Sequence, residues 1–167
     1  MAMASARRLQ AITVVVLIAL DQMVKALVRS HLEYGHSSAV IPGFFDLTRV
    51  HNTGAAFGML DPVDFPYKTI VMPLVSAAAL AGLALYAASL DVAQWLSRVG
   101  LTFVVAGAAG NLIDRLIFGY VLDFVDVYWR GWHFWAFNVA DASITVGVVF
   151  MILDLLGAGR HRASRTV

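Results

Sequence analysis

The sequence predicts a mainly α-helical membrane protein, with four transmembrane helices and a small extracytoplasmic β-sheet over their outer ends. Hydrophobic residues make up 60% of the 167 residues and charged residues 14%, and the mean hydropathy is +0.76. A soluble core of this size cannot bury so much apolar surface, so lipid must be the solvent. The apolar residues fall into four long runs, and two connections between them are rich in strand-forming residues.

The four apolar runs cover about residues 9–27, 67–89, 99–118 and 139–156. Each is close to the roughly 20 residues that cross a bilayer as a helix. The first run follows Arg7 and Arg8, as in a secretory signal, but it is long and lacks a small-residue cleavage site, which favours a retained helix. No linker, repeat or low-complexity tract divides the chain, so we expect one membrane domain over residues 1–167.

Four spans place both termini on the same side of the membrane. Arginines flank that side and predict that it is cytoplasmic, because cytoplasmic loops are enriched in basic residues. They are Arg7, Arg8, Arg98, Arg160, Arg162 and Arg165. On this topology the connections 30–66 and 119–138 face outward.

The outer connections contain two predicted strands. Residues 44–51 follow a Pro42-Gly43 turn, and Asn52, Thr53 and Gly54 supply the next turn. In residues 121–129, strict alternation would place Asp123 on the apolar face of the strand. Five aromatic residues before the fourth span predict a belt at the headgroup level. They are Trp129, Trp132, Phe134, Trp135 and Phe137.

Two carboxylates are the leading candidates for chemistry. Asp141 lies at the mouth of the fourth span, three residues after Asn138, and Asp123 lies eighteen positions before it. An ionisable group in this setting is costly and suggests function, and two neighbouring carboxylates that share a proton form an acid/base pair. The spacing of Asn138 and Asp141 equally fits a helix cap without any chemistry, which leaves the burial of Asp123 unexplained.

Polar residues within the spans have two interpretations. Asp21 and Lys25 are four residues apart and suit an ion pair on one helix face, which either neutralises itself or positions a neighbouring group. A polar stripe in the third span either holds helices together or grips a substrate backbone. It contains Gly107, Asn111, Asp114 and Arg115.

Other kinds of site find little support. The chain has no cysteine, its five histidines lack ligand spacing, and a net charge of +1 gives no reason to expect a nucleic-acid partner. A Ser-Lys nucleophile would combine Lys25 with Ser143 or Ser30. A small proton-coupled transporter is the alternative from another class, and an assembly subunit without activity is the third, but the carboxylates gather at the outer end of the spans.

Five blocks of sequence together resemble lipoprotein signal peptidases, the bacterial signal peptidase II family of intramembrane aspartyl proteases. The blocks cover most of the chain in the family's order. They are DQMVK at 21–25, HNTGAAF at 51–57, GAAGNLIDRL at 107–116, GYVLDF at 119–124 and FNVADASI at 137–144.

The resemblance implies a role for each matching residue. Asp123 and Asp141 would be the catalytic pair, without a metal or other cofactor. The residues lining the substrate site would be Asn52, Asn111, Arg115 and Asn138. The supporting residues would be Asp21, Lys25, Gly54, Gly107, Asp114 and Ala140.

The resemblance also implies the substrate and the location. The substrate would be a diacylglyceryl-modified prolipoprotein, cleaved on the amino side of its lipidated cysteine. The enzyme would lie in the bacterial cytoplasmic (inner) membrane, in contact with membrane lipids. Apart from the resemblance, we expect a monomer. Its active site would lie at the outer face.

Overall fold

The computed structural model describes residues 2–54, 67–90 and 94–163. The end of the second matching block, residues 55–57, and Arg165 lie outside these residues, as do the side chains of Arg160 and Arg162. The predicted spans, the strand segments and both candidate aspartates fall within them.

The described residues form four helices that are long and apolar enough to cross a membrane. They are α1 (Ala2–His31), α2 (Lys68–Ser89), α3 (Trp95–Phe118) and α4 (Val139–Ala163). The predicted fold class is therefore confirmed. The helices α1 and α3 begin several residues before the apolar runs, because hydropathy marks the part that crosses lipid, whereas a helix continues into the polar turns at its ends.

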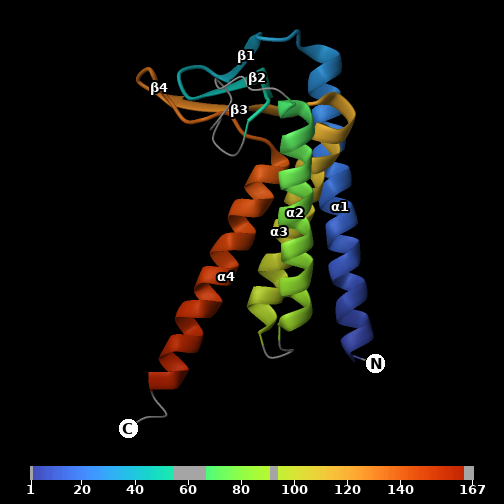
Figure 1. Ribbon diagram of the computed structural model, residues 1–167. Helices are drawn as coiled ribbons and strands as arrows, with labels where there is room; N and C mark the ends of the chain where they lie inside the picture. The colour runs from blue at the N-terminus through green and yellow to red at the C-terminus, as the bar shows by residue number, and fades with distance from the viewer. Residues whose placement is uncertain (1, 55–66, 91–93, 164–167) are drawn as a thin grey trace.

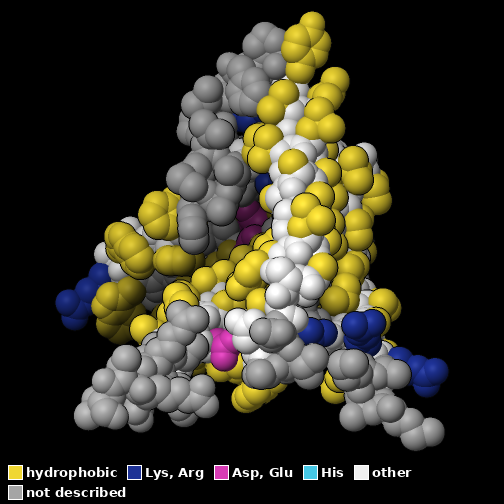
Figure 2. Space-filling view, turned by 60° about the horizontal axis from the view of Figure 1, so that its bottom comes forward, with side chains coloured by type: hydrophobic (Ala, Val, Ile, Leu, Met, Phe, Trp, Pro, Cys, Tyr) yellow, Lys and Arg dark blue, Asp and Glu magenta, His cyan; other side chains and the backbone are white. Residues whose placement is uncertain are grey.

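Three helices run side by side and the fourth diverges from them (Figure 1). The helix α3 packs against α1, α2 and α4, and α4 moves away from α2 toward its carboxyl end. The start of α1 and the end of α4 lie at the same end of the molecule, opposite the sheet. The helix surface is largely hydrophobic (Figure 2), as expected of side chains that face lipid.

The described strands form one antiparallel sheet at the other end of the helices. Its order is β1 (Ser37–Ile41), β2 (Phe45–Asn52), β3 (Val121–Trp129) and β4 (Trp132–His133). The strands β2 and β3 confirm the two predicted segments, whereas β1 and β4 were not predicted. Gly43, with φ 82°, provides the left-handed residue of the turn between β1 and β2.

The predicted alternation along β3 is wrong at its amino end. Four consecutive residues, 121–124, are buried, while Trp129 is 61% exposed. Both faces of the strand are covered there, because Leu122 and Phe124 pack against Val28 of α1 on one side. On the other side Asp123 meets Asn52 of β2 and Asn138, the residue before α4. The burial of Asp123 thus comes from its position between helices and sheet.

Glycines allow α3 and α4 to approach closely at two levels. Gly100 of α3 faces Gly147 of α4, and a Cβ added to Gly100 would lie 2.5 Å from the Gly147 carbonyl oxygen. Nearer the sheet, a Cβ on Gly107 would lie 2.2 Å from the carbonyl oxygen of Ala140. Small residues at such crossings bring helix backbones into contact in lipid. This contact fixes the first turn of α4 against α3.

Candidate active site

Asp123 lies on β3 between two amide side chains. The Asn52 side chain donates a hydrogen bond of 3.0 Å from Nδ2 to Oδ2 of Asp123, and the Asn138 side chain donates one of 2.7 Å from Nδ2 to Oδ1. Asp123 is only 3% exposed. Both carboxyl oxygens are therefore engaged by neutral donors in a buried setting.

Asp141 lies in the first turn of α4 and forms a capping box with Asn138. The Asp141 N–H donates to Oδ1 of Asn138 at 2.9 Å, and the Asn138 N–H donates to Oδ2 of Asp141 at 3.3 Å. The other oxygen, Oδ1, accepts a 2.8 Å hydrogen bond from Nδ2 of Asn111. The cap accounts for the spacing in the sequence, and it leaves one oxygen of Asp141 for other partners.

Asn138 connects the two aspartates. Its side-chain nitrogen donates to Asp123. Its side-chain oxygen accepts the Asp141 N–H, and its main-chain N–H donates to the Asp141 carboxylate. The side-chain nitrogen also approaches Oδ1 of Asn111 at 3.2 Å and the Leu122 carbonyl at 3.2 Å. Asn138 is fully buried. One residue thus fixes both carboxylates relative to each other.

Lys25 of α1 lies beneath this pair and is fully buried. Its Nζ is 2.8 Å from Oδ2 of Asp21 and 3.0 Å from Oδ2 of Asp114, so the predicted Asp21–Lys25 ion pair is confirmed. Lys25 also donates to Oδ1 of Asn111 at 3.0 Å. Because that oxygen accepts from Lys25, the Asn111 amide nitrogen must point toward Asp141. Lys25 therefore orients a neighbour as well as neutralising two carboxylates.

Asp21 and Asp114 each hold the backbone next to a candidate aspartate. Oδ1 of Asp21 accepts the Ala140 N–H at 2.9 Å, one residue before Asp141. Oδ2 of Asp114 accepts the Leu122 N–H at 3.1 Å, one residue before Asp123. The two arrangements are equivalent in form, and they tie both aspartates to the same Lys25 ion-pair cluster.

Two further residues of this cluster were not predicted as site residues. Gln22 donates from Nε2 to the Gly110 carbonyl at 3.1 Å and approaches Asp114 at 3.3 Å. Arg29 pairs with Asp114 at 2.9 Å, and its guanidinium lies 3.8 Å from the centre of the Phe118 ring. Arg29 is four residues after Lys25, and this spacing on one helix face was the available signal.

Arg115 contacts the end of β2. It donates from Nη2 to the Gly54 carbonyl at 2.8 Å, and the Gly54 N–H donates to Oδ1 of Asn52 at 2.9 Å. The predicted turn at Asn52, Thr53 and Gly54 is therefore present. The Nε of Arg115 is buried and has no hydrogen-bond partner among the described residues. Arg115 thus holds the segment that carries Asn52, and it retains one unused donor.

The environment of Asp123 favours its protonated form. Burial raises the pKa of the Asp123 carboxyl to about 7, and the negative charge of Asp141 acts in the same direction. The hydrogen bonds from Asn52 and Asn138 and the charge of Lys25 oppose this shift. A carboxyl with a pKa near neutrality beside a second carboxyl can donate and accept protons at physiological pH.

The structure does not bring together the alternative Ser-Lys pair. Ser143 donates to the Phe103 carbonyl of α3 at 2.9 Å, and Ser30 donates to the Leu27 carbonyl of its own helix. Among the described residues, Lys25 contacts Asn111, Asp21 and Asp114 and neither of these hydroxyls. Among these residues there is likewise no group of three His, Asp or Glu that could hold a metal ion.

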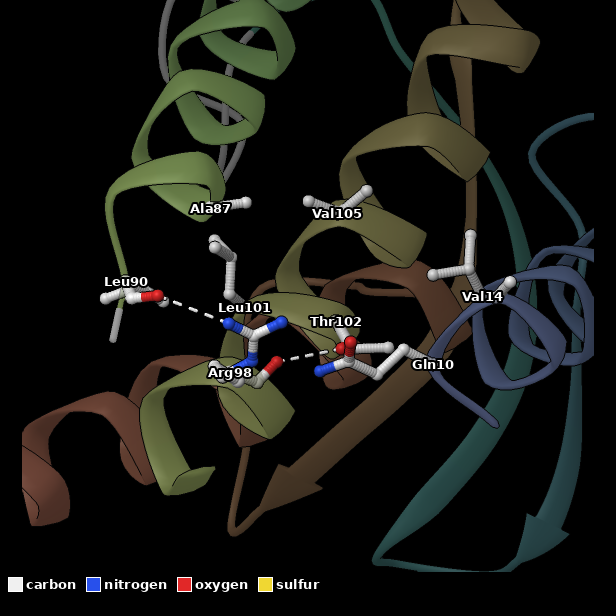
Figure 3. A pocket seen from close by; sticks show the side chains of 9 residues that line it. Gln10, Val14, Ala87, Leu90, Arg98, Leu101, Thr102 and Val105 are labelled. Carbon is white, nitrogen blue, oxygen red and sulfur yellow. Dashed lines mark hydrogen bonds between the residues drawn. The ribbon is translucent and has the colours of Figure 1, made fainter. Parts of the chain in front are cut away.

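A cavity at the opposite end of the helices is remote from both aspartates. It measures about 180 Å³ and lies between α1, α2 and α3 (Figure 3). Arg98 in its wall donates to the Leu90 carbonyl at 3.2 Å, where α2 ends, and its own carbonyl accepts from Thr102 at 2.8 Å. A cation at the carboxyl end of a helix is favourable, so Arg98 has a structural role here.

The comparisons with known proteins identify the family. The model of the family described as signal peptidase (SPase) II matches residues 13–157. The chain belongs to the signal peptidase II family. A lipoprotein signal peptidase of Geobacter metallireducens is 40% identical over 156 residues, which are 93% of this chain and 95% of that protein. One of Geobacter sulfurreducens is 42% identical over 144 residues, 86% of this chain and 89% of that protein.

A solved structure supports the same assignment. A bacterial membrane enzyme determined by the in meso method at 1.9 Å resolution superposes with a TM-score of 0.77 and 31% identity. The match covers 88% of this chain and 92% of that one. This member of the signal peptidase II family is therefore a peptidase of multi-pass membrane architecture.

Proposed function

We propose that the protein is an intramembrane aspartyl endopeptidase in which Asp123 and Asp141 are the catalytic pair. The observation that carries this proposal is the position of Asn138, which hydrogen-bonds both carboxylates and holds them at one site. The proposed substrate is a diacylglyceryl-modified prolipoprotein, cleaved on the amino side of the lipidated cysteine. The lipoprotein signal peptidases that the chain resembles support this choice.

The two aspartates have different environments, and this suggests different roles. The raised pKa of Asp123 favours its protonated form as the general acid. Asp141 accepts two N–H groups and lies at the amino end of α4, where the helix dipole favours a negative charge. Asp141 is therefore the proposed general base.

Hydrolysis then follows the usual chemistry of an aspartate pair. Ionised Asp141 takes a proton from a water molecule, whose oxygen attacks the scissile carbonyl carbon while protonated Asp123 donates its proton to the carbonyl oxygen. The resulting tetrahedral intermediate collapses, the C–N bond breaks, and the leaving nitrogen receives the proton held by Asp141. Asp123 regains its proton from the intermediate's hydroxyl, so the pair returns to its starting state.

The remaining polar residues are proposed to position the peptide and the aspartates. The buried Nε of Arg115 is an unused donor near Asn52 and suits a backbone carbonyl of an extended substrate. The Lys25 cluster keeps Asn111 directed at Asp141. We place this site at the outer face of the bacterial inner membrane, with both termini in the cytoplasm, as the flanking arginines suggest. No metal or organic cofactor is required for these steps.

Cleavage of a diacylglyceryl-modified prolipoprotein by the purified protein in detergent, with a chelator present, tests the proposal. Asp123→Asn and Asp141→Asn should abolish turnover, because neither amide can cycle a proton. Asp126→Asn is the matched control, since Asp126 lies on the same strand and pairs with His133 instead. Near-normal turnover by a folded Asp141→Asn variant would leave Asp141 with a capping role alone. A proton-coupled transporter would show no cleavage by any variant.

A further inference from the structure

A second polar feature lies between α2, α3 and α4, near the helix ends remote from the sheet. A cavity of about 320 Å³ there has Tyr86, Ser97 and Asp154 among its lining residues, one from each helix. Most of the remaining lining is aliphatic and comes from α4. Figure 2 looks toward this end and shows an acidic side chain among hydrophobic ones. A polar group is thus set into an apolar cavity.

The carboxylate of Asp154 has few contacts among the described residues. Its Oδ2 accepts a hydrogen bond from Oγ of Ser97, which is buried. Among the described residues it forms no ion pair, and no other hydrogen bond to it is present. A half-buried carboxylate within a transmembrane helix is costly without a cation. A basic group of a bound molecule would supply the positive charge that the described residues do not.

One face of α4 connects the level of this cavity with Asp141. Val148, Ile152 and Leu155 line the cavity and follow Asp141 by seven, eleven and fourteen residues, so they share its face of α4. On α3, Ser97 precedes Asn111 by fourteen residues and shares its face likewise. The helices α2 and α4 both pack on α3 and diverge from each other (Figure 1). The exposed residues Val148, Ile152 and Leu155 therefore extend an apolar face of α4 from the level of Asp141 to the cavity.

We propose that this surface receives the apolar segment of the signal peptide, and that Asp154 binds a Lys or Arg of its basic amino-terminal region. The inference rests on the proposed function and names a specificity-determining residue for it. Asp141 and Asp154 are thirteen residues apart on one helix, which is about 20 Å. The apolar region of a signal peptide has about 7–15 residues after its basic region, or about 10–22 Å as a helix. The length and the charge both fit.

The first test combines a change in the enzyme with a change in the substrate. Asp154→Asn should raise KM about three- to fivefold with kcat unchanged, since an accessible ion pair contributes binding alone. Replacing the basic residues of the signal peptide by Gln should raise KM equally for the wild-type enzyme, and the two changes together should add nothing further. Glu33→Gln is the control, because it removes the same charge at an exposed residue near the sheet.

A reversal of charge makes the test directional. Asp154→Lys should prefer a signal peptide whose basic residues are replaced by Glu, whereas Asp154→Glu should behave like wild type. Additive effects of the enzyme and substrate changes, or an unchanged KM with the neutral substrate, would overturn the inference. Turnover of the wild type in the same assay keeps the proposed function separate from this outcome.

Cross-linking provides a second readout that does not depend on Asp154 variants folding. The chain has no cysteine, so Leu155→Cys introduces a single thiol in the cavity. Leu153→Cys is the matched control, because Leu153 is 51% exposed on another face of α4. In the presence of a mild thiol oxidant, a signal peptide with one cysteine in its basic region should form a disulfide with Leu155→Cys and not with Leu153→Cys. Equal or reversed cross-linking would refute the proposed path.

Discussion

The contact between Gly107 and Ala140 gives the sharpest prediction about the site. Gly107→Ala would place a methyl group 2.2 Å from the Ala140 carbonyl oxygen and 2.7 Å from Ile144, whereas ordinary contact begins near 3.4 Å. A backbone atom cannot rotate away, so α4 must move from α3 by about 1 Å at Ala140. Ala140 is the residue before Asp141, and Asp21 holds its N–H.

The displacement should affect activity more than folding. A misplacement of about 1 Å can lower a rate by about 100-fold, because the reacting groups lose their alignment. Overpacking at one site costs about 1–3 kcal/mol in the free energy of unfolding, which a folded protein can tolerate. We therefore expect kcat for a lipidated prolipoprotein to fall about 100-fold, while thermal unfolding in detergent shows a folded protein with a moderately lower Tm.

Gly82→Ala is the control for this change. Gly82 also lies inside a transmembrane helix, and a Cβ there would meet nothing within 4 Å. Replacing it removes a flexible residue without a clash, so kcat and Tm should stay at or above the wild-type values. If Gly107→Ala retains kcat within about threefold of wild type, helix contact at Ala140 does not set the position of Asp141.

Three further predictions follow from the hydrogen bonds and the buried charges. The raised pKa of Asp123 keeps this residue protonated below about pH 7, so kcat/KM should fall as pH rises through that value. A pH–rate profile that stays level to about pH 9 would contradict the role of Asp123 as the acid. Lys25→Met removes the cation that Asp21 and Asp114 share and should lower the free energy of unfolding by about 3–5 kcal/mol. Denaturant titration measures this loss, with Lys25→Met compared to the exposed control Arg8→Met. A loss under about 1 kcal/mol would contradict the buried ion pairs. Asn138→Ala removes the hydrogen bonds to both carboxylates and should lower kcat at least about 100-fold. The lost helix cap should lower the free energy of unfolding by about 1 kcal/mol. Activity near wild type would show that Asn138 is only a cap.

Hydropathy predicted the helices well, because the length of an apolar run measures the bilayer directly. The strands β2 and β3 were also predicted, since their strand-forming residues lie between recognisable turns. In contrast, β1 consists of five exposed residues and β4 of two, so neither leaves an alternation pattern in the sequence. The register of Asp123 opposite Val50 depends on an irregularity in β2, which no periodicity could reveal.

The polar cluster was predicted in composition but only partly in its pairing. Spacing along one helix identified the Asp21–Lys25 pair. It assigned Asp114 to a stripe on α3, although Asp114 binds Lys25 and Arg29 of α1. Contacts between helices depend on their relative rotation and depth, and the sequence of one helix carries no direct signal for these. The same limit concealed Gln22.

The charges of the linked cluster explain why one aspartate should carry a proton. Among the described residues, hydrogen bonds and ion pairs between side chains connect two cations to four carboxylates. These are Lys25, Arg29, Asp21, Asp114, Asp123 and Asp141. A buried cluster with excess negative charge is costly, so a bound proton is favoured. Asp123 and Asp141 contact no cation among the described residues, but Asp141 lies at the amino end of α4, where the helix dipole favours its charge, whereas only neutral amides bind the oxygens of Asp123. The proton therefore belongs on Asp123, where the proposed reaction requires an acid.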